Sequence, residues 1–254
     1  MLEPLAVKLA FMFIGFGTVL NVATILLGSV LGVLVGNRLK ESTRNLVMDV
    51  LGAVTLISAA GAIFAIWDTK LTNATPQGAP ILVVLGSLLI GGVLGAALDL
   101  EGRLENLGGY LKSKLDKKGN SPFIEGFVTA SLIFVIGPLA ILGSISDGMG
   151  SGIEQLTLKS ILDFFASIAF AATLGWGVAA SAIPVGVYQL AWTAMGLLAG
   201  QVLADYQISA MTAVGGVLLL GIAFRLLKIK EIAVGNLLPA LAFAPLLAFL
   251  ARLF

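Results

Sequence analysis

The chain has 254 residues, of which 58% are hydrophobic and 11% are charged, and it contains a further 31 glycines. Soluble domains carry about 25% charged residues, so this composition excludes an ordinary soluble protein and also intrinsic disorder. Basic and acidic residues nearly balance, at 15 and 14, which excludes nucleic-acid binding that rests on a basic surface. The sequence contains no Cys and no His, so any ion or proton chemistry must use oxygen and amide groups.

Charged or turn-rich segments divide the chain into hydrophobic runs near the 17–25 residues that a membrane-spanning helix needs. The expected spans are residues 14–36, 45–66, 80–98, 123–143, 158–181, 183–203, 208–226 and 233–252. The apolar stretch Leu5–Phe13 either extends the first helix or lies at the membrane interface. A tight hairpin at 181–184 separates the fifth and sixth spans, because Pro184 suits the first turn of a helix. The sequence therefore predicts an all-α, polytopic bundle of about eight transmembrane helices, forming one membrane domain over residues 1–254.

Basic residues are concentrated in three loops, 37–45, 99–122 and 225–232, which hold 11 of the 15. Eight spans place all three loops on one side of the membrane. The positive-inside rule makes that side cytoplasmic, so both termini are predicted to be extracytoplasmic.

Glycines spaced four residues apart mark the first and third spans. They are Gly28, Gly32 and Gly36, then Gly91 and Gly95. In lipid, such small residues let helices approach closely. We expect packing within the chain, and the alternative is a subunit interface or a channel-lining helix. The similar Gly-rich stretches that precede the basic loops either reflect two parallel four-helix halves, 1–118 and 119–254, or arose independently.

Polar side chains within the spans cost free energy in hydrocarbon and tend to face the bundle interior. The amide of Asn21, about two turns into the first span, can coordinate a cation or hydrogen-bond a neighbouring helix. Asp163 is the only carboxylate well inside an expected span, and Lys159 is within ion-pair reach four residues earlier. The two residues form either a self-neutralising pair or an ion site at which a cation competes with Lys159.

A possible helix break lies in the fourth span at Gly137 and Pro138, because proline removes a backbone donor and frees a carbonyl. The hydroxyls of Ser144 and Ser146, together with Asp147, would complete an oxygen-only cation site. The alternative is an ordinary kink followed by an exit turn.

Two further amides are candidates. Gln189 follows Tyr188 in the sixth span, and Trp192 lies one turn beyond; interface anchoring explains the aromatic residues but not the glutamine. Asn236 opens the last helix with Pro239 and either contributes to a site or only starts the helix.

These segments resemble the YqgA/YdfK family. The resemblance is carried by the run 137–148, the step from Lys159 to Asp163, the segment 181–189, the segment 236–239 and the opening 17–21 followed by Gly28 and Gly32. It covers about residues 15–250, and the chain departs from the family before Gly15 and at Phe164–Phe165, where a small residue is common. The resemblance implies a multi-pass bacterial inner-membrane protein of unknown function, for which a sodium channel or pump has been suggested.

The leading hypothesis is a channel or secondary transporter for a small cation, with Na⁺ favoured. The candidate ligands are Asn21, Ser144, Ser146, Asp147, Lys159, Asp163, Gln189 and Asn236. The sequence has no nucleotide-binding loop, so an ATP-driven pump would need a partner chain. Alternatives are transport of a small organic solute, with Tyr188, Trp192 and Gln189 lining its pocket, and a non-transporting oligomeric assembly or signalling component. We expect no enzymatic activity and no cofactor; the expected partners are the lipid bilayer, a small ion or solute and further copies of this chain.

Overall fold

The computed structural model describes residues 13–115, 122–200 and 203–254, and every regular element in these ranges is helical. The elements are α2 (Phe16–Gly36), α3 (Glu41–Ile63), η1 (Phe64–Trp67), α4 (Thr69–Thr72), α5 (Ala79–Ala97), α6 (Leu100–Leu115), α7 (Phe123–Val135), α8 (Pro138–Gly148), α9 (Glu154–Leu174), α10 (Gly177–Ala180), α11 (Ala182–Ala199), α12 (Asp205–Leu226), η2 (Val234–Leu237) and α13 (Ala240–Ala251). The all-α prediction is confirmed. The stretch before Phe13 lies outside the described residues.

Seven helical segments are long and apolar enough to cross a membrane, and the bent pair α7 and α8 would make an eighth if it crosses as one. Large apolar side chains on these segments point outward: Ile57 is 72% exposed and Val93 is 73% exposed. Such surfaces suit contact with lipid, which has no polar groups in its hydrocarbon core. The multi-pass membrane architecture therefore agrees with the prediction of about eight spans.

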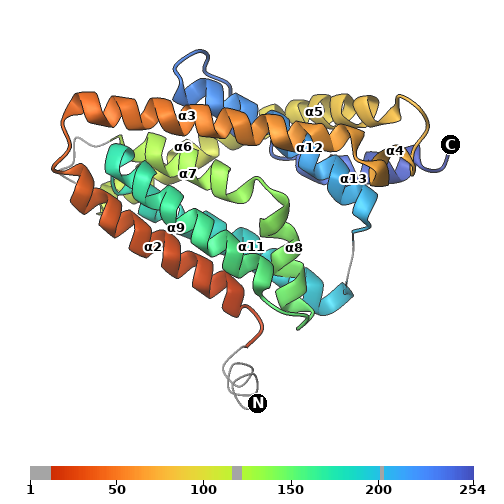
Figure 1. Cartoon of the computed structure of the whole chain (residues 1–254), viewed down its shortest axis with the longest axis horizontal. Coiled ribbons are helices and arrows are strands. Elements are labelled where there is room, and N and C mark those ends of the chain that lie inside the picture. Colours follow the sequence, from red (N-terminus) through yellow and green to blue (C-terminus); the bar gives the residue numbers. More distant parts are fainter. Residues whose placement is uncertain (1–12, 116–121, 201–202) are drawn as a thin grey trace.

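The fourth expected span is broken. The axes of Phe123–Val135 and Leu139–Gly148 differ by 63°, and the break lies at the predicted Gly–Pro step. Gly137 has a φ of 151°, which residues with a Cβ rarely adopt, and the proline that follows it has no N–H to continue the α7 hydrogen bonds. As a result, α8 runs across the neighbouring helices in Figure 1 instead of continuing along α7.

The turn between the fifth and sixth expected spans lies earlier than the predicted hairpin at 181–184. Helix α9 ends at Leu174, and Gly175 follows it with a φ of 74°. The short helix α10 then leads into α11. Even a methyl group at Gly177 would overlap the backbone carbonyl of Phe123, so the turn is packed directly against the start of α7. Pro184 predicts a turn at 181–184, whereas Gly175 and Gly177 form the turn in the structure.

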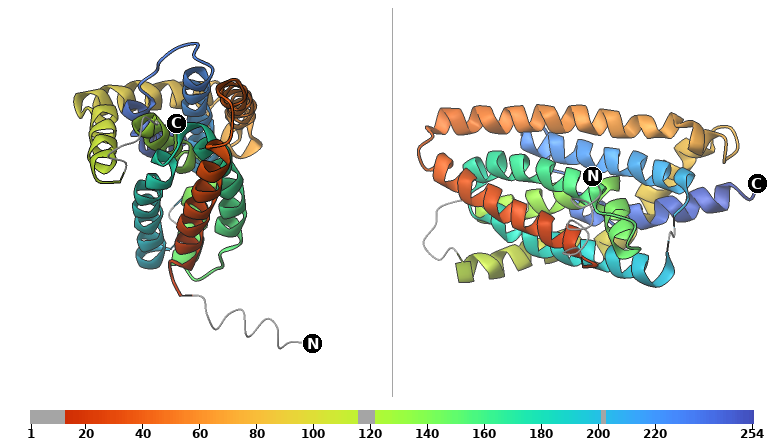
Figure 2. Two further views of the ribbon diagram at one scale, coloured as in Figure 1. Left: turned by 90° about the vertical axis from the view of Figure 1, so that its left-hand side faces the viewer. Right: turned by 60° about the horizontal axis from the view of Figure 1, so that its bottom comes forward.

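The expected loop 99–122 also contains a helix, α6. Its leucines Leu104 and Leu111 pack against the hydrophobic core, whereas Arg103 is exposed. The many charges of this segment predict a loop. The apolar residues that form one face of α6 are separated in sequence by charged residues, so the helical pattern is hard to recognise. Figures 1 and 2 show α6 alongside α7, toward the same end of the molecule as the α2–α3 turn and the loop after α12.

Packing sorts the helices into two groups. The first helix group comprises α2 and α7–α11, and the second helix group comprises α3, α5, α12 and α13. In Figure 1 the second group lies along the top and right, with α3 running over α12. Contacts between α3 and α9 join the two groups. Each group combines helices from both sides of residue 118, and the two internal halves remain a prediction.

The predicted glycine faces pack within this single chain. A methyl group at Gly28, Gly32 or Gly36 would overlap a backbone carbonyl oxygen of α9, and the contacted α9 residue advances by four at each step. Helices α2 and α9 are therefore parallel and in backbone contact. In the second group, Gly91 and Gly95 lie equally close to the backbone of Ala240 and Asn236. These glycines are needed because no larger residue fits between the backbones.

Candidate functional site

Asp147, near the end of α8, binds the beginning of α2. Its carboxylate accepts hydrogen bonds from the backbone amides of Gly15, at 3.2 Å, and Gly17, at 3.1 Å. The side chain lies in the interior, and the residue is only 4% exposed. Free amides at a helix N-terminus favour a negative charge. The break at Gly137 redirects α8, and this contact joins the redirected helix to α2.

Buried amides without hydrogen-bond partners lie on α2 and α11. Asn21 and Gln189 are both 0% exposed, and neither the nitrogen nor the oxygen of either side chain is paired within the described part of the chain. The same holds for the hydroxyls of Thr18 and Thr193, which are 2% and 3% exposed. A buried polar atom left without any partner costs about 1–3 kcal/mol, so six such atoms would cost about as much as the net stability of a whole domain, about 5–15 kcal/mol. Buried polar groups in native proteins normally have a protein, water or ion partner, which makes these side chains candidate ligands.

The backbone at the start of α2 lies beside Asp147. A Cβ atom placed on Gly17 would be 3.1 Å from the Oδ2 atom of Asp147. Asn21 is four residues after Gly17 and therefore lies one turn further along the same helix face. Thr18 occupies the neighbouring position, and its backbone amide faces the same carboxylate.

Helix α11 lies beside the residues that neighbour Asp147. The Cβ position of Gly15 is 3.6 Å from the side chain of Leu190, and Gly148 packs against the backbone carbonyl of Thr193. The segment of α11 that carries Gln189 and Thr193 therefore lies alongside the two backbone segments that hold Asp147. We call Thr18, Asn21, Asp147, Gln189 and Thr193 the Asp147 cluster.

Lys159 and Asp163 form a buried ion pair on α9. The ammonium nitrogen is 2.5 Å from the Asp163 Oδ2 atom, and the two residues are 6% and 7% exposed. The ammonium group also lies 5.8 Å from the centre of the Phe134 ring. This geometry matches the self-neutralising interpretation. Asp147, by contrast, has no ion-pair partner among the described residues.

The two candidate serines of α8 differ in position. Ser144 is fully buried, and its hydroxyl donates to the carbonyl of Ala140 at 2.6 Å. Ser146 is only half-buried, and its position two residues further on places it on a different helix face from Ser144. The structure therefore does not bring Ser144, Ser146 and Asp147 together as one three-residue ligand set.

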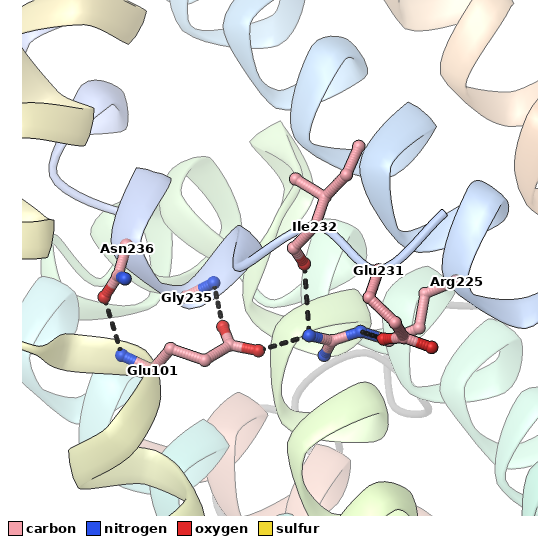
Figure 3. Close-up of polar contacts among 6 residues, drawn as sticks. All are labelled: Glu101, Arg225, Glu231, Ile232, Gly235 and Asn236. Carbon is pink, nitrogen blue, oxygen red and sulfur yellow. Dashed lines mark hydrogen bonds and ion pairs between the residues drawn. The ribbon is translucent and has the colours of Figure 1, made fainter. Parts of the chain in front are cut away.

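Asn236 lies in the second helix group, apart from the Asp147 cluster. Its side-chain oxygen accepts a hydrogen bond from the backbone amide of Glu101 at 2.9 Å, at the start of α6 (Figure 3). The carboxylate of Glu101 accepts a hydrogen bond from the amide of Gly235 at 2.5 Å. The amide of Asn236 thus ties the beginning of α6 to η2.

Arg225 completes this corner of the second group. Its guanidinium forms an ion pair with the buried Glu101 and donates to the carbonyl of Ile232 at 3.1 Å (Figure 3). A second carboxylate, that of the exposed Glu231, lies 3.1 Å from the Arg225 Nε atom. We call Glu101, Arg225, Gly235 and Asn236 the Glu101 corner. These contacts hold the turn between α5 and α6 against the loop that joins α12 to η2.

Thr193, Glu101 and Arg225 are not among the residues that the sequence singles out, whereas Asn236 is. Thr193 follows Gln189 by four residues, so helical spacing alone could have added it to the candidate ligands. Glu101 and Arg225 were treated only as loop charges, and no local pattern indicates that they pair across 124 positions. In the described residues, no group of three acidic side chains could hold a metal ion in the usual way.

Comparisons with known proteins agree with this membrane architecture. Residues 16–249 match the family model described as "Protein of unknown function (DUF554)". The chain is 30% identical over 243 residues to the "Uncharacterized membrane protein YdfK" of Bacillus subtilis (strain 168), covering 94% of this chain and 98% of the relative. It is 32% identical over 233 residues to the "Uncharacterized protein YqgA" of Escherichia coli (strain K12), covering 90% and 94%. No solved structure matches the chain. The chain therefore belongs to the DUF554 family, and YdfK and YqgA are its relatives over most of their length.

Proposed function

We propose that this protein transports a small cation across the membrane, as a channel or a secondary transporter. One observation carries the proposal: the amides of Asn21 and Gln189 are fully buried and unpaired within a helix group that contains a broken helix. Intramembrane polar groups are costly, and in transporters they line ion or substrate pathways beside interrupted helices. Amide oxygens, hydroxyls and carboxylates are hard ligands of the kind that alkali cations prefer. Na⁺ is the first ion to test, and no catalytic step is part of the proposal.

Purified protein in proteoliposomes tests this function. Vesicles loaded with a fluorescent Na⁺ or K⁺ reporter should show cation entry above that of empty vesicles. Asn21→Leu and Gln189→Leu should each reduce the flux about tenfold or more, because each removes an amide from the pathway. Asn73→Leu is the matched control, because Asn73 is an exposed amide that follows α4 and is not part of the Asp147 cluster. The flux through this variant should equal that of the wild type. Flux equal to that of empty vesicles for all alkali cations would refute the function.

The alternative of a small organic solute draws less support from the structure. Tyr188 and Trp192 contact each other with their ring centres 6.2 Å apart and pack against the hydrophobic core. The nearby groove of about 670 Å³ is lined instead by apolar residues such as Leu26, Ile183 and Leu190. A surface of this kind suits a lipid acyl chain better than a polar solute. A metabolite that stabilised the protein as strongly as a cation would favour the alternative.

The glycine face of α2 does not support the alternative of an oligomeric assembly. Gly28, Gly32 and Gly36 are buried against α9 of the same chain, so they leave no free glycine face for a second copy. A homo-oligomer remains a prediction that rests on other surfaces.

A further inference from the structure

We infer that the Asp147 cluster binds one monovalent cation, with Asp147 as its charged ligand, and that Lys159 and Asp163 are a neutral structural pair instead of ligands. The inference deepens the proposed function and rests on it, because it names the charged residue and the number of ions bound.

Charge balance in the first helix group supports this assignment. Lys159 and Asp163 neutralise each other at 2.5 Å, whereas the described residues offer Asp147 only backbone amides. Among the described residues, an ionised Asp147 would therefore be a buried negative charge without a counter-ion. Charge is costly in a low-dielectric interior, so one monovalent cation would neutralise the site, and a divalent cation would leave an excess positive charge.

The unpaired side chains of α2 and α11, the two helices next to Asp147, offer further ligands. Asn21 and Gln189 each present a carbonyl oxygen, and Thr18 and Thr193 each present a hydroxyl oxygen with free lone pairs. Together with Asp147 these five side chains come from three helices, α2, α8 and α11. Four of the five are neutral, which again fits a singly charged cation.

Asp163 is unsuited to this role in the structure. Its carboxylate is already engaged by the Lys159 ammonium, and that ammonium is held over the Phe134 ring. A cation at Asp163 would have to displace a tethered cation of equal charge. The Asp147 carboxylate has no such competitor among the described residues.

The test is cation binding by the full-length protein in detergent. The unfolding temperature and the tryptophan fluorescence, to which Trp192 on α11 contributes, are recorded during titration with NaCl, KCl, LiCl or MgCl₂, with choline chloride holding ionic strength constant. We expect saturable stabilisation by at least one monovalent cation with a Hill coefficient near one. Stabilisation by Mg²⁺ alone, or by no cation, would overturn the inference and point to water as the occupant.

Four variants separate the two carboxylates. Asp147→Asn should weaken cation binding at least about tenfold, whereas the exposed-carboxylate control Asp49→Asn should leave it unchanged. The double variant Lys159→Met/Asp163→Leu removes both charges of the pair and should bind the cation within about threefold of the wild type. Should Asp147→Asn fail to fold, Lys159→Met provides the second measurement: it leaves two negative charges in the interior, so the monovalent cation should bind more tightly. Loss of binding in the double variant with retention in Asp147→Asn would overturn the assignment, as would unchanged or weaker binding in Lys159→Met.

The two proposals fail in different ways. Saturable binding that depends on Asp147, without flux in proteoliposomes, would refute transport and leave the binding site standing. Flux that is unaffected by Asp147→Asn would refute the binding site and leave transport standing.

Discussion

The Asp147 cluster and the Glu101 corner each contain a buried carboxylate and at least one amide side chain, but their hydrogen bonding differs. In the Glu101 corner, the carboxylate, the guanidinium and the side-chain oxygen of Asn236 all have partners within 3.1 Å. In the Asp147 cluster, two amides and two hydroxyls have none among the described residues. The two sites are therefore alike in burial and differ in how many of their side-chain hydrogen bonds are made within the described residues. We propose that the unsatisfied amides and hydroxyls of the Asp147 cluster bind an ion.

The largest expected effect comes from breaking the Glu101 corner. Arg225→Met leaves the buried Glu101 carboxylate without its counter-ion and should lower the free energy of unfolding by about 3–5 kcal/mol. Thermal unfolding in detergent measures the change. Arg103→Met, an exposed arginine on α6, should change stability by less than about 0.5 kcal/mol. Equal effects of the two variants would show that the Glu101–Arg225 ion pair does not contribute to the free energy of unfolding.

The next effect tests the scaffold that holds the Asp147 cluster. Gly32→Val places a branched side chain against the backbone carbonyl of Ile168 and should force α2 away from α9, at a cost of about 1–3 kcal/mol or more. Gly61→Ala is the control, because nothing lies within 4 Å of its Cβ position and alanine favours a helix. Cation binding should fall with Gly32→Val and stay unchanged with Gly61→Ala. A fully stable Gly32→Val variant would contradict the close α2–α9 contact.

A smaller loss should follow Asn236→Leu. The variant removes the hydrogen bond to the amide of Glu101 and should lower the free energy of unfolding by about 1–2 kcal/mol. Cation flux should persist in the protein that remains folded, because Asn236 lies in the other helix group. Flux lost at full stability would instead return Asn236 to the list of ion ligands.

The same substitution at Asn21 should have the smallest effect on stability. In contrast to Asn236→Leu, it should reduce the cation flux. Asn21→Leu removes two unpaired polar atoms, so in cation-free buffer its free energy of unfolding should stay within about 0.5 kcal/mol of the wild type or rise. Its flux should fall sharply. A loss of stability as large as that of Asn236→Leu, measured without cation, would mean that Asn21 is a structural residue like its counterpart.

Several features of the fold and of the candidate site could be predicted from the spacing of residues close together in the sequence. The Gly137–Pro138 break, the Lys159–Asp163 pair and the glycine face of α2 follow from residues at most eight positions apart, and the structure contains all three. The parallel pairing of α2 with α9 and the ion pair between Glu101 and Arg225 connect residues more than 100 positions apart. Such contacts depend on how helices pack, which no local pattern encodes.

The sequence by itself determined that this protein suits a membrane and is built of helices, although α6 and the turn after α9 differ from the prediction. A chain with 58% hydrophobic residues and 11% charged residues must bury its backbone polar groups in helices when it lies in lipid. The tertiary structure decided which polar residues are already paired. Asp163 is the foremost candidate from the sequence, and its partner Lys159 lies 2.5 Å away, whereas the described residues offer Asp147 only the amides at the start of α2. Hydrogen bonds and ion pairs depend on positions in space to within a few tenths of an ångström, and only the packing of α2, α8, α9 and α11 sets those positions.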